Sequence, residues 1–176
     1  MKENKRLFYV ICDNIRSLEN IGSIFRTADA LGIDKIFLCG ISGRPPIGEK
    51  QSTFLERKSA RPSTQNLSAL VSKTALGAEK TIPFEHYWQT WRAVEKLRKE
   101  KFQIVALEQD KKSILYTKFK PKFPLALIVG NEVKGVSKKI LNKSDKIIYL
   151  PMQGKKESLN VSVAFGIAGY EINKFR

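Results

Sequence analysis

Gly130 and Glu132 are the first residues of this chain whose types and spacing could bind a ligand. They follow an apolar run, residues 125–129, that is typical of a buried strand. Glycine lets backbone amides approach a flat or charged ligand closely, and a glutamate carboxylate accepts hydrogen bonds. The segment could therefore form a ligand-binding turn. Taken alone, an ordinary strand-to-helix turn explains it more simply.

A second such segment follows the apolar run at residues 146–150. Pro151 ends that run because proline has no backbone donor. A helical apolar pattern begins at residue 161, and Ser158 or Asn160 can cap it with a side-chain oxygen. A loop held between a strand and a capped helix is suited to binding a ligand.

Asn20 directly precedes the first predicted helix, residues 21–31, and Arg26 lies within it. Asn20 is explained most simply as the N-cap of that helix. Helical geometry places Arg26 beside the apolar stripe of the helix rather than opposite it. An arginine at such a margin either extends its guanidinium to water or holds an anion.

Several common catalytic chemistries lack their residues here. The segment 130–137 resembles a phosphate-binding loop, but Val136 stands where that loop needs lysine. His86 is the only histidine, which argues against a hydrolytic triad and favours a structural role. We expect no metal ion, because no second histidine or carboxylate cluster accompanies it. Cys12 and Cys39 indicate buried thiols rather than a disulfide framework.

Apolar runs that alternate with helical patterns must position these residues. Continuous apolar strands with intervening helices predict an α/β fold with a parallel sheet covered on both faces. Its 176 residues suit one domain, 1–176. The predicted strands cover residues 7–12, 35–39, 103–107, 125–129 and 146–150, and the predicted helices cover residues 21–31, 65–72, 87–97 and 161–170. Residues 111–122 form a polar and basic segment between two of these strands.

The charge of the chain favours an anionic partner. Thirty-two Lys and Arg against 17 Asp and Glu give a formal charge of +15. The sequence pI of about 9.9 is typical of nucleic-acid-binding domains. No apolar segment approaches transmembrane length, and we expect a cytoplasmic protein with no membrane partner.

Three segments in this order resemble the motifs of the SpoU (TrmH-type) RNA 2′-O-ribose methyltransferases, within the SPOUT superfamily. They are Asn20-Ile21-Gly22-Ser23-Ile24-Phe25-Arg26-Thr27-Ala28, Gly130-Asn131-Glu132-Val133-Lys134-Gly135, and Pro151-Met152-Gln153-Gly154 through Ser158-Leu159-Asn160-Val161-Ser162-Val163-Ala164. The resemblance covers nearly the whole chain as a catalytic domain without a separate RNA-binding extension. It implies a C-terminal trefoil knot, S-adenosyl-L-methionine as cofactor, and a homodimer whose RNA site is shared between subunits.

The resemblance also implies roles for individual residues. Backbone and side chains after three strands would bind the cofactor: Leu107, Gly130, Leu150, Met152, Ser158 and Leu159. The polar motif residues would form the catalytic site: Asn20, Arg26, Glu132, Ser158 and Asn160. Arg26 would bind the target phosphate and stabilise the forming alkoxide, with Glu132 and Asn160 orienting it. The proton would leave through water or through a perturbed Arg26, although a guanidinium holds its own proton strongly.

The substrate is expected to be structured RNA, with tRNA favoured over rRNA. Basic residues near the motifs would bind it: Arg26, Arg44, Arg57, Lys58, Arg61, Lys155 and Lys156. The alternative is a non-enzymatic RNA-binding or ribosome-assembly protein that retains the knotted fold. Intact polar residues at the motif positions argue against that alternative.

Overall fold

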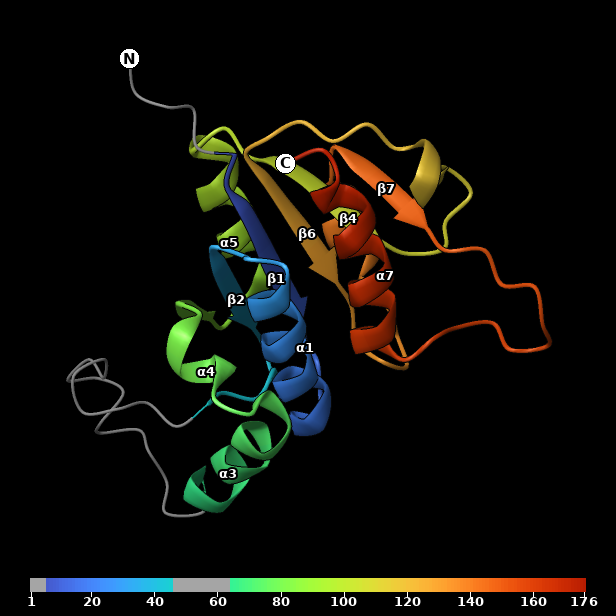
Figure 1. Cartoon of the computed structure of the whole chain (residues 1–176). Helices are drawn as coiled ribbons and strands as arrows, with labels where there is room; N and C mark the ends of the chain where they lie inside the picture. The colour runs from blue at the N-terminus through green and yellow to red at the C-terminus, as the bar shows by residue number, and fades with distance from the viewer. Residues whose placement is uncertain (1–5, 46–63) are drawn as a thin grey trace.

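The computed structural model describes residues 6–45 and 64–176, and it contains a seven-stranded sheet (Figure 1). All strand pairs are parallel, and the order is β3-β2-β1-β6-β4-β7-β5. The strands are β1 (Phe8–Asp13), β2 (Lys35–Cys39), β3 (Phe84–Tyr87), β4 (Gln103–Leu107), β5 (Ile114–Leu115), β6 (Leu125–Val129) and β7 (Lys146–Tyr149). The prediction of a parallel sheet is confirmed.

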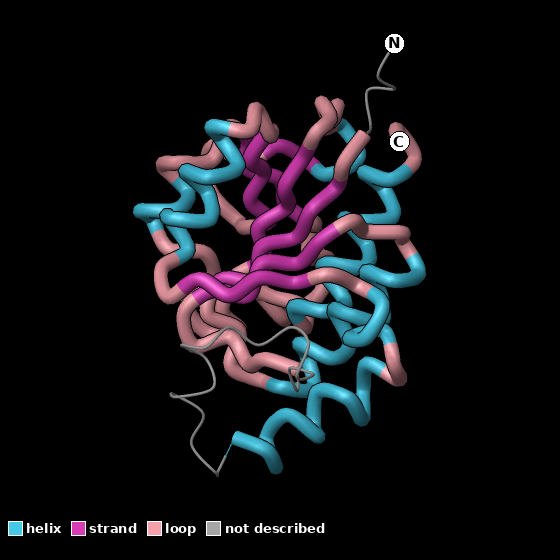
Figure 2. The backbone as a smooth tube through the Cα atoms, turned by 90° about the vertical axis from the view of Figure 1, so that its left-hand side faces the viewer, coloured by secondary structure: helices cyan, strands magenta, loops and turns pink. Residues whose placement is uncertain are grey.

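Helices cover both faces of this sheet (Figure 2). Those of the described residues are α1 (Leu18–Ala30), α3 (Thr64–Ala75), α4 (Ala78–Thr81), α5 (Thr90–Lys99), the 3-10 helix η1 (Tyr116–Lys118), α6 (Lys138–Leu141) and α7 (Val161–Asn173). Helices α1, α3, α4 and α7 pack against one face of the sheet, and α5 and α6 pack against the other face. None of the described helices is long and apolar enough to span a lipid bilayer.

The alternation of side chains along each strand builds two cores. In β1, Val10 and Cys12 point into the core beneath α1 and α7, whereas Ile11 points into the core beneath α5. All three side chains are fully buried. This double burial explains why the central strands appear in the sequence as continuous apolar runs.

One local prediction was wrong, and several short elements were not predicted. Tyr87 does not begin a helix, because it ends β3 and α5 begins at Thr90. β3 is an edge strand whose four residues are all half-buried, so no apolar run marks it. The polar and basic segment 111–122 contains β5 and η1, two short elements that its sequence did not indicate.

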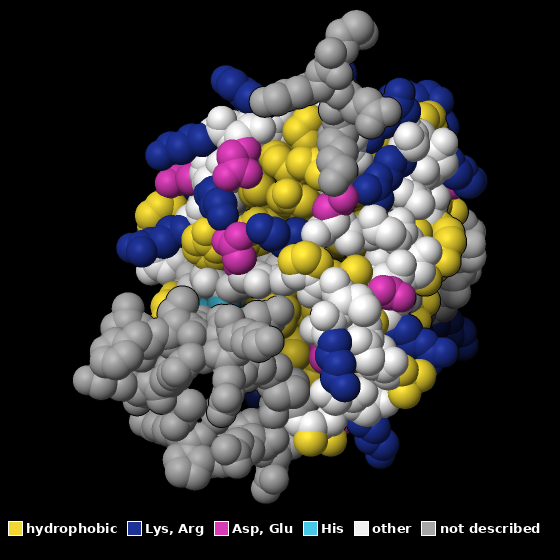
Figure 3. Space-filling model, turned by 60° about the vertical axis from the view of Figure 1, so that its left-hand side comes forward, with side chains coloured by type: hydrophobic (Ala, Val, Ile, Leu, Met, Phe, Trp, Pro, Cys, Tyr) yellow, Lys and Arg dark blue, Asp and Glu magenta, His cyan; other side chains and the backbone are white. Residues whose placement is uncertain are grey.

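Parallel strands bring the loops that carry the motifs to one edge of the sheet. β6 lies between β1 and β4, and β7 lies beside β4. The loops after β1, β6, β4 and β7 are therefore neighbours, as expected for a ligand site in an open α/β fold. The trefoil knot stays a prediction. Figure 3 shows basic side chains spread over one face with acidic side chains among them, so charge alone does not locate an RNA site.

Candidate active site

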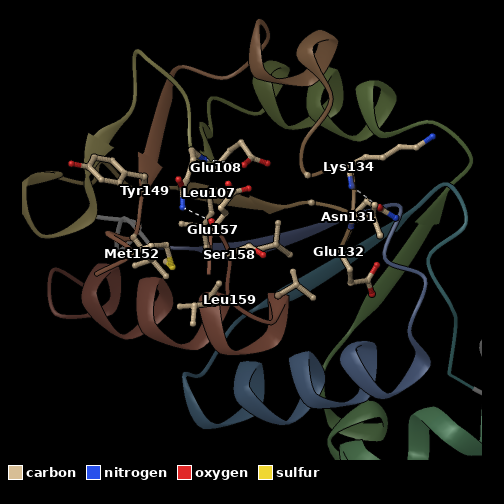
Figure 4. A pocket seen from close by; sticks show the side chains of 18 residues that line it. Leu107, Glu108, Asn131, Glu132, Lys134, Tyr149, Met152, Glu157, Ser158 and Leu159 are labelled. Atoms are coloured by element: carbon tan, nitrogen blue, oxygen red, sulfur yellow. Dashed lines mark hydrogen bonds between the residues drawn. The ribbon is translucent and has the colours of Figure 1, made fainter. Parts of the chain in front are cut away.

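A pocket of about 410 Å³ opens at the carboxyl ends of β4, β6 and β7 (Figure 4). All six residues predicted to bind the cofactor line it: Leu107, Gly130, Leu150, Met152, Ser158 and Leu159. The other lining residues are Glu108, Gln109, Val129, Asn131, Glu132, Val133, Lys134, Gly135, Tyr149, Glu157, Val161 and Ala164. Its size falls within the range of about 300–1,000 Å³ that is usual for small-molecule sites.

Two glycines shape the loop after β6. Gly135 has a φ of +63°, which favours glycine, and a Cβ there would collide with the Glu108 carboxylate. A Cβ on Gly130 would collide with the backbone of Gly135 and Val136. The Glu108 carboxylate accepts hydrogen bonds from the backbone N–H of Val136 at 2.7 Å and of Gln109 at 2.9 Å. Sequence reasoning missed Glu108, although its position directly after β4 could have revealed it.

The loop between β7 and α7 forms the remaining wall of the pocket. Figure 4 shows Met152 and Leu159 on the side of α7, with Ser158 between them and Glu132. Gln109 fixes this loop by donating its side-chain amide to the Glu157 backbone oxygen at 2.9 Å. The loops after β4 and β7 are therefore joined at the mouth of the pocket.

Glu132 lies at the end of the pocket next to α1 (Figure 4). Its carboxylate accepts hydrogen bonds from the backbone N–H of Arg16 at 3.1 Å and of Ser17 at 3.0 Å, and from the Asn20 side-chain amide at 3.0 Å. Burial raises the pKa of Glu132, but these hydrogen bonds outweigh it and hold the pKa below its ordinary value. Glu132 is thus a carboxylate committed to holding the start of α1.

Asn20 links Glu132 to α7. Its side-chain oxygen accepts a hydrogen bond from the Asn160 side-chain amide at 2.9 Å. Asn160 is the N-cap of α7, and its side-chain oxygen accepts from the Ser162 backbone N–H at 2.9 Å. The N-cap of α1 is Ser17, not Asn20 as predicted, so the Asn20 side-chain oxygen is available to accept from Asn160. One hydrogen-bonded chain therefore connects all three motifs.

Arg26 stands apart from this chain of contacts. Its side chain is exposed on α1, does not line the pocket, and makes no hydrogen bond or ion pair with a described residue. Glu132 and Asn160 contact Asn20 rather than orienting Arg26 within the same chain.

The predicted RNA-binding residues lie in separate places. Lys155 and Lys156 are exposed beside the pocket loop, and Arg44 is half-buried after β2. Three further predicted residues, Arg57, Lys58 and Arg61, lie outside the described residues. Among the described residues, no three His, Cys, Asp or Glu side chains gather as a metal site would require.

Comparison with known sequences and structures identifies the family. Residues 48–170 match the SpoU rRNA Methylase family. The chain belongs to this family. A tRNA (guanosine(18)-2′-O)-methyltransferase of Aquifex aeolicus is 30% identical over 176 residues, which are 100% of this chain and 73% of that SpoU-type relative. Both comparisons include the second and third motifs, and the relative's match also includes the first.

Two further relatives are longer than this SpoU-family chain. YacO of Bacillus subtilis strain 168, classed in the TrmH family of tRNA/rRNA methyltransferases, is 31% identical over 99% of this chain, which spans 61% of it. An AdoMet-bound rRNA methyltransferase of Sinorhizobium meliloti has the same fold, with a TM-score of 0.77 and 26% identity. That alignment covers 96% of this chain and 56% of the relative.

Proposed function

We propose that this protein transfers a methyl group from S-adenosyl-L-methionine to a ribose 2′-hydroxyl of structured RNA, with tRNA favoured over rRNA. The observation that carries the proposal is the hydrogen-bonded chain from Glu132 through Asn20 to Asn160, which joins all three family motifs at the rim of a ligand-sized pocket. The Aquifex relative is named as a tRNA 2′-O-methyltransferase, which favours tRNA.

The pocket fits this cofactor in size and charge. Its charged lining residues are three carboxylates, Glu108, Glu132 and Glu157, and one cation, Lys134, in a chain whose formal charge is +15. An acidic lining suits a cofactor that carries its methyl group on a positively charged sulfonium. The glycines at 130 and 135 let the loop after β6 fold tightly on itself and against Glu108, which leaves its backbone at the pocket wall.

Glu132 does not serve as the general base in this proposal. Its carboxylate already accepts three hydrogen bonds and has a lowered pKa, so it binds a proton poorly. Arg26 binds the target phosphate and stabilises the developing alkoxide, because a guanidinium stays protonated and only donates. The hydroxyl proton then leaves to water. Glu132 and Asn20 position α1, the helix that carries Arg26.

Arg26 reaches the reacting hydroxyl from a second copy of the chain. On its own chain it does not line the pocket. Helix α7, which forms one wall of the pocket, presents an exposed apolar stripe of Val163, Ile167 and Tyr170, which are 50%, 39% and 55% exposed. Their spacing of four and three residues places them on one helical face, which suits an interface between two copies. We therefore propose a homodimer with a shared RNA site.

The deciding experiments measure cofactor binding, product and site sharing. Calorimetry should detect S-adenosyl-L-methionine binding, and mapping of 2′-O-methyl groups in RNA from cells with and without the gene should show one missing methyl. Arg26→Ala and Gly135→Ala, each inactive alone, should regain about a quarter of wild-type activity when equal amounts are mixed, because half of the dimers hold one complete site. No cofactor heat and no missing methyl would refute the enzyme. No recovery on mixing would refute site sharing.

A further inference from the structure

Trp88 is a large aromatic side chain exposed at the same edge of the sheet as the pocket. It directly follows β3 and is 76% exposed. The Arg44 guanidinium lies 6.0 Å from the centre of its ring, and the His86 ring packs edge-on at 5.0 Å. His86 in turn contacts the Gly40 backbone oxygen at 3.2 Å. The Trp88 ring therefore packs against a histidine that is itself held in place by the backbone.

A second tryptophan follows three residues later in the chain. Trp91, in the first turn of α5, is half-buried, and two cations lie near its ring centre, Arg92 at 5.4 Å and Lys139 at 5.5 Å. Lys139 belongs to α6, the helix that directly follows the glycine loop of the pocket. We call Arg44, Trp88, Trp91, Arg92 and Lys139 the Trp88 surface.

The cations of the Trp88 surface each lie over a tryptophan ring, Arg44 over Trp88 and both Arg92 and Lys139 over Trp91. Arg44, Arg92 and Lys139 form no salt bridge with any described residue. Most basic residues of the described ranges likewise lack a salt bridge, so the neighbouring tryptophan rings, and not the missing ion pairs, set these three cations apart. The basic residues that do form salt bridges are Lys35, Lys96, Arg98, Lys143, Lys174 and Arg176. Aromatic rings beside cations are the combination that binds single-stranded nucleic acid.

We propose that the Trp88 surface holds the substrate RNA by stacking an unpaired base on the Trp88 ring, while Arg44, Arg92 and Lys139 contact phosphates. The inference rests on the proposed function and deepens it. β3 is three strands from β6, so at about 4.8 Å per strand Trp88 stands about 14 Å along the edge from the pocket loop. The stacked base is therefore a neighbour of the methylated nucleotide and not that nucleotide itself.

Contacts connect this surface with the catalytic network. The Asn14 side chain accepts a hydrogen bond from the Ile41 backbone N–H at 3.3 Å, next to Gly40. The Asn14 backbone oxygen accepts from the Asn131 side-chain amide at 2.7 Å, next to Glu132. These two hydrogen bonds connect the loop under Trp88 with the pocket loop that carries Glu132, and in this proposal they hold the stacked base at a constant distance from the pocket.

The first test uses Trp88 as its own reporter. The chain has two tryptophans, so the variant Trp91→Phe leaves Trp88 as the only one. This variant is titrated with an oligouridine of twelve nucleotides, a length of about the size that single-strand-binding domains cover. Stacking of a uracil on the Trp88 ring should quench its fluorescence. Unchanged fluorescence at saturating oligouridine would overturn the proposal.

The second test measures affinity for the same oligouridine. Trp88→Ala should weaken binding about 5- to 150-fold, and Trp88→Phe, which keeps a ring, should lose much less. Arg92→Ala should weaken binding more than Lys99→Ala, which removes an equal charge from the exposed far end of α5. If Arg92→Ala and Lys99→Ala lose the same amount of affinity, the RNA is attracted only by the net charge of the protein, and the proposal is overturned.

Failure of this inference is distinguishable from failure of the proposed function. Trp88→Ala should bind S-adenosyl-L-methionine as the wild type does, since Trp88 does not line the pocket. A wild type that binds no cofactor refutes the enzyme, but the oligouridine results stand on their own. If Trp88→Ala keeps both full RNA affinity and full methyl transfer, the surface serves a contact with another protein and the proposal is wrong.

Discussion

Replacing Glu132 by Gln tests whether one carboxylate holds the start of α1. The change keeps the shape of the side chain but removes the charge that accepts hydrogen bonds from Arg16, Ser17 and Asn20. Hydrogen bonds to charged groups contribute about 1.5–3 kcal/mol each when buried, but Glu132 is largely exposed, so we expect a total loss of about 1–2 kcal/mol. For a chain of this size that lowers the melting temperature by about 2–8 °C.

The matched control is Glu157→Gln, which removes an equal charge from the same pocket. Among the described residues, the Glu157 carboxylate accepts no hydrogen bond, so this variant should melt like the wild type. Calorimetric melts of the three proteins at neutral pH measure the difference. Equal melting temperatures for the two variants would refute the role assigned to Glu132.

The pH dependence of the same variant provides an independent check. The pKa of Glu132 is lower in the folded chain than in the unfolded chain. The carboxylate therefore stabilises the fold fully above the unfolded pKa of about 4.3, and this contribution disappears as pH falls through the lower folded pKa. The stability gap between wild type and Glu132→Gln should close on acidification. A gap that stays constant down to strongly acidic pH would contradict the assigned hydrogen bonds.

Two other substitutions follow from the structure. Gly135→Ala should abolish detectable cofactor binding in calorimetry while the chain stays folded, because a Cβ there meets Glu108 at a positive φ; normal binding would show that the loop adapts freely. Burial raises the pKa of Glu85, but Lys96 at 2.8 Å and Lys35 at 2.9 Å lower it to about 2. In urea unfolding, Glu85→Gln should be less stable than the wild type at neutral pH, and this difference in unfolding free energy should disappear as pH falls from about 4.5 to 2. A difference that persists at pH 2 would contradict the salt bridges.

The central strands could be predicted from sequence because both of their faces are buried. Ile11 and Phe37 point into one core, and Val10 and Leu38 point into the other. Each strand therefore appears in the sequence as an uninterrupted run of apolar residues. β3 gave no such signal. Its residues are half-buried at the sheet edge, and their mixed character matches no simple period.

The residue types at the site could be predicted, but their pairing could not. Asn20 and Glu132 are 112 positions apart, and they meet only because β6 lies beside β1. The order of strands in the sheet does not follow from the apolar runs, because a buried apolar strand could pair with any of several other strands. The N-cap prediction for Asn20 was wrong for a related reason: Ser17, three positions earlier, provides an equally good capping oxygen.

The position of β6 between β1 and β4 has a consequence for the nascent chain. One edge of β1 pairs early with β2, but its other edge waits for β6, which places Leu125 opposite Phe8. Until more than two thirds of the chain has been synthesised, β1 exposes a row of unpaired backbone groups and the apolar side chains of Phe8, Val10, Ile11 and Cys12. Such an edge promotes aggregation, and pairing between distant strands is slow. Chains of this fold should therefore depend on chaperones or slow translation in the interval before β6 leaves the ribosome.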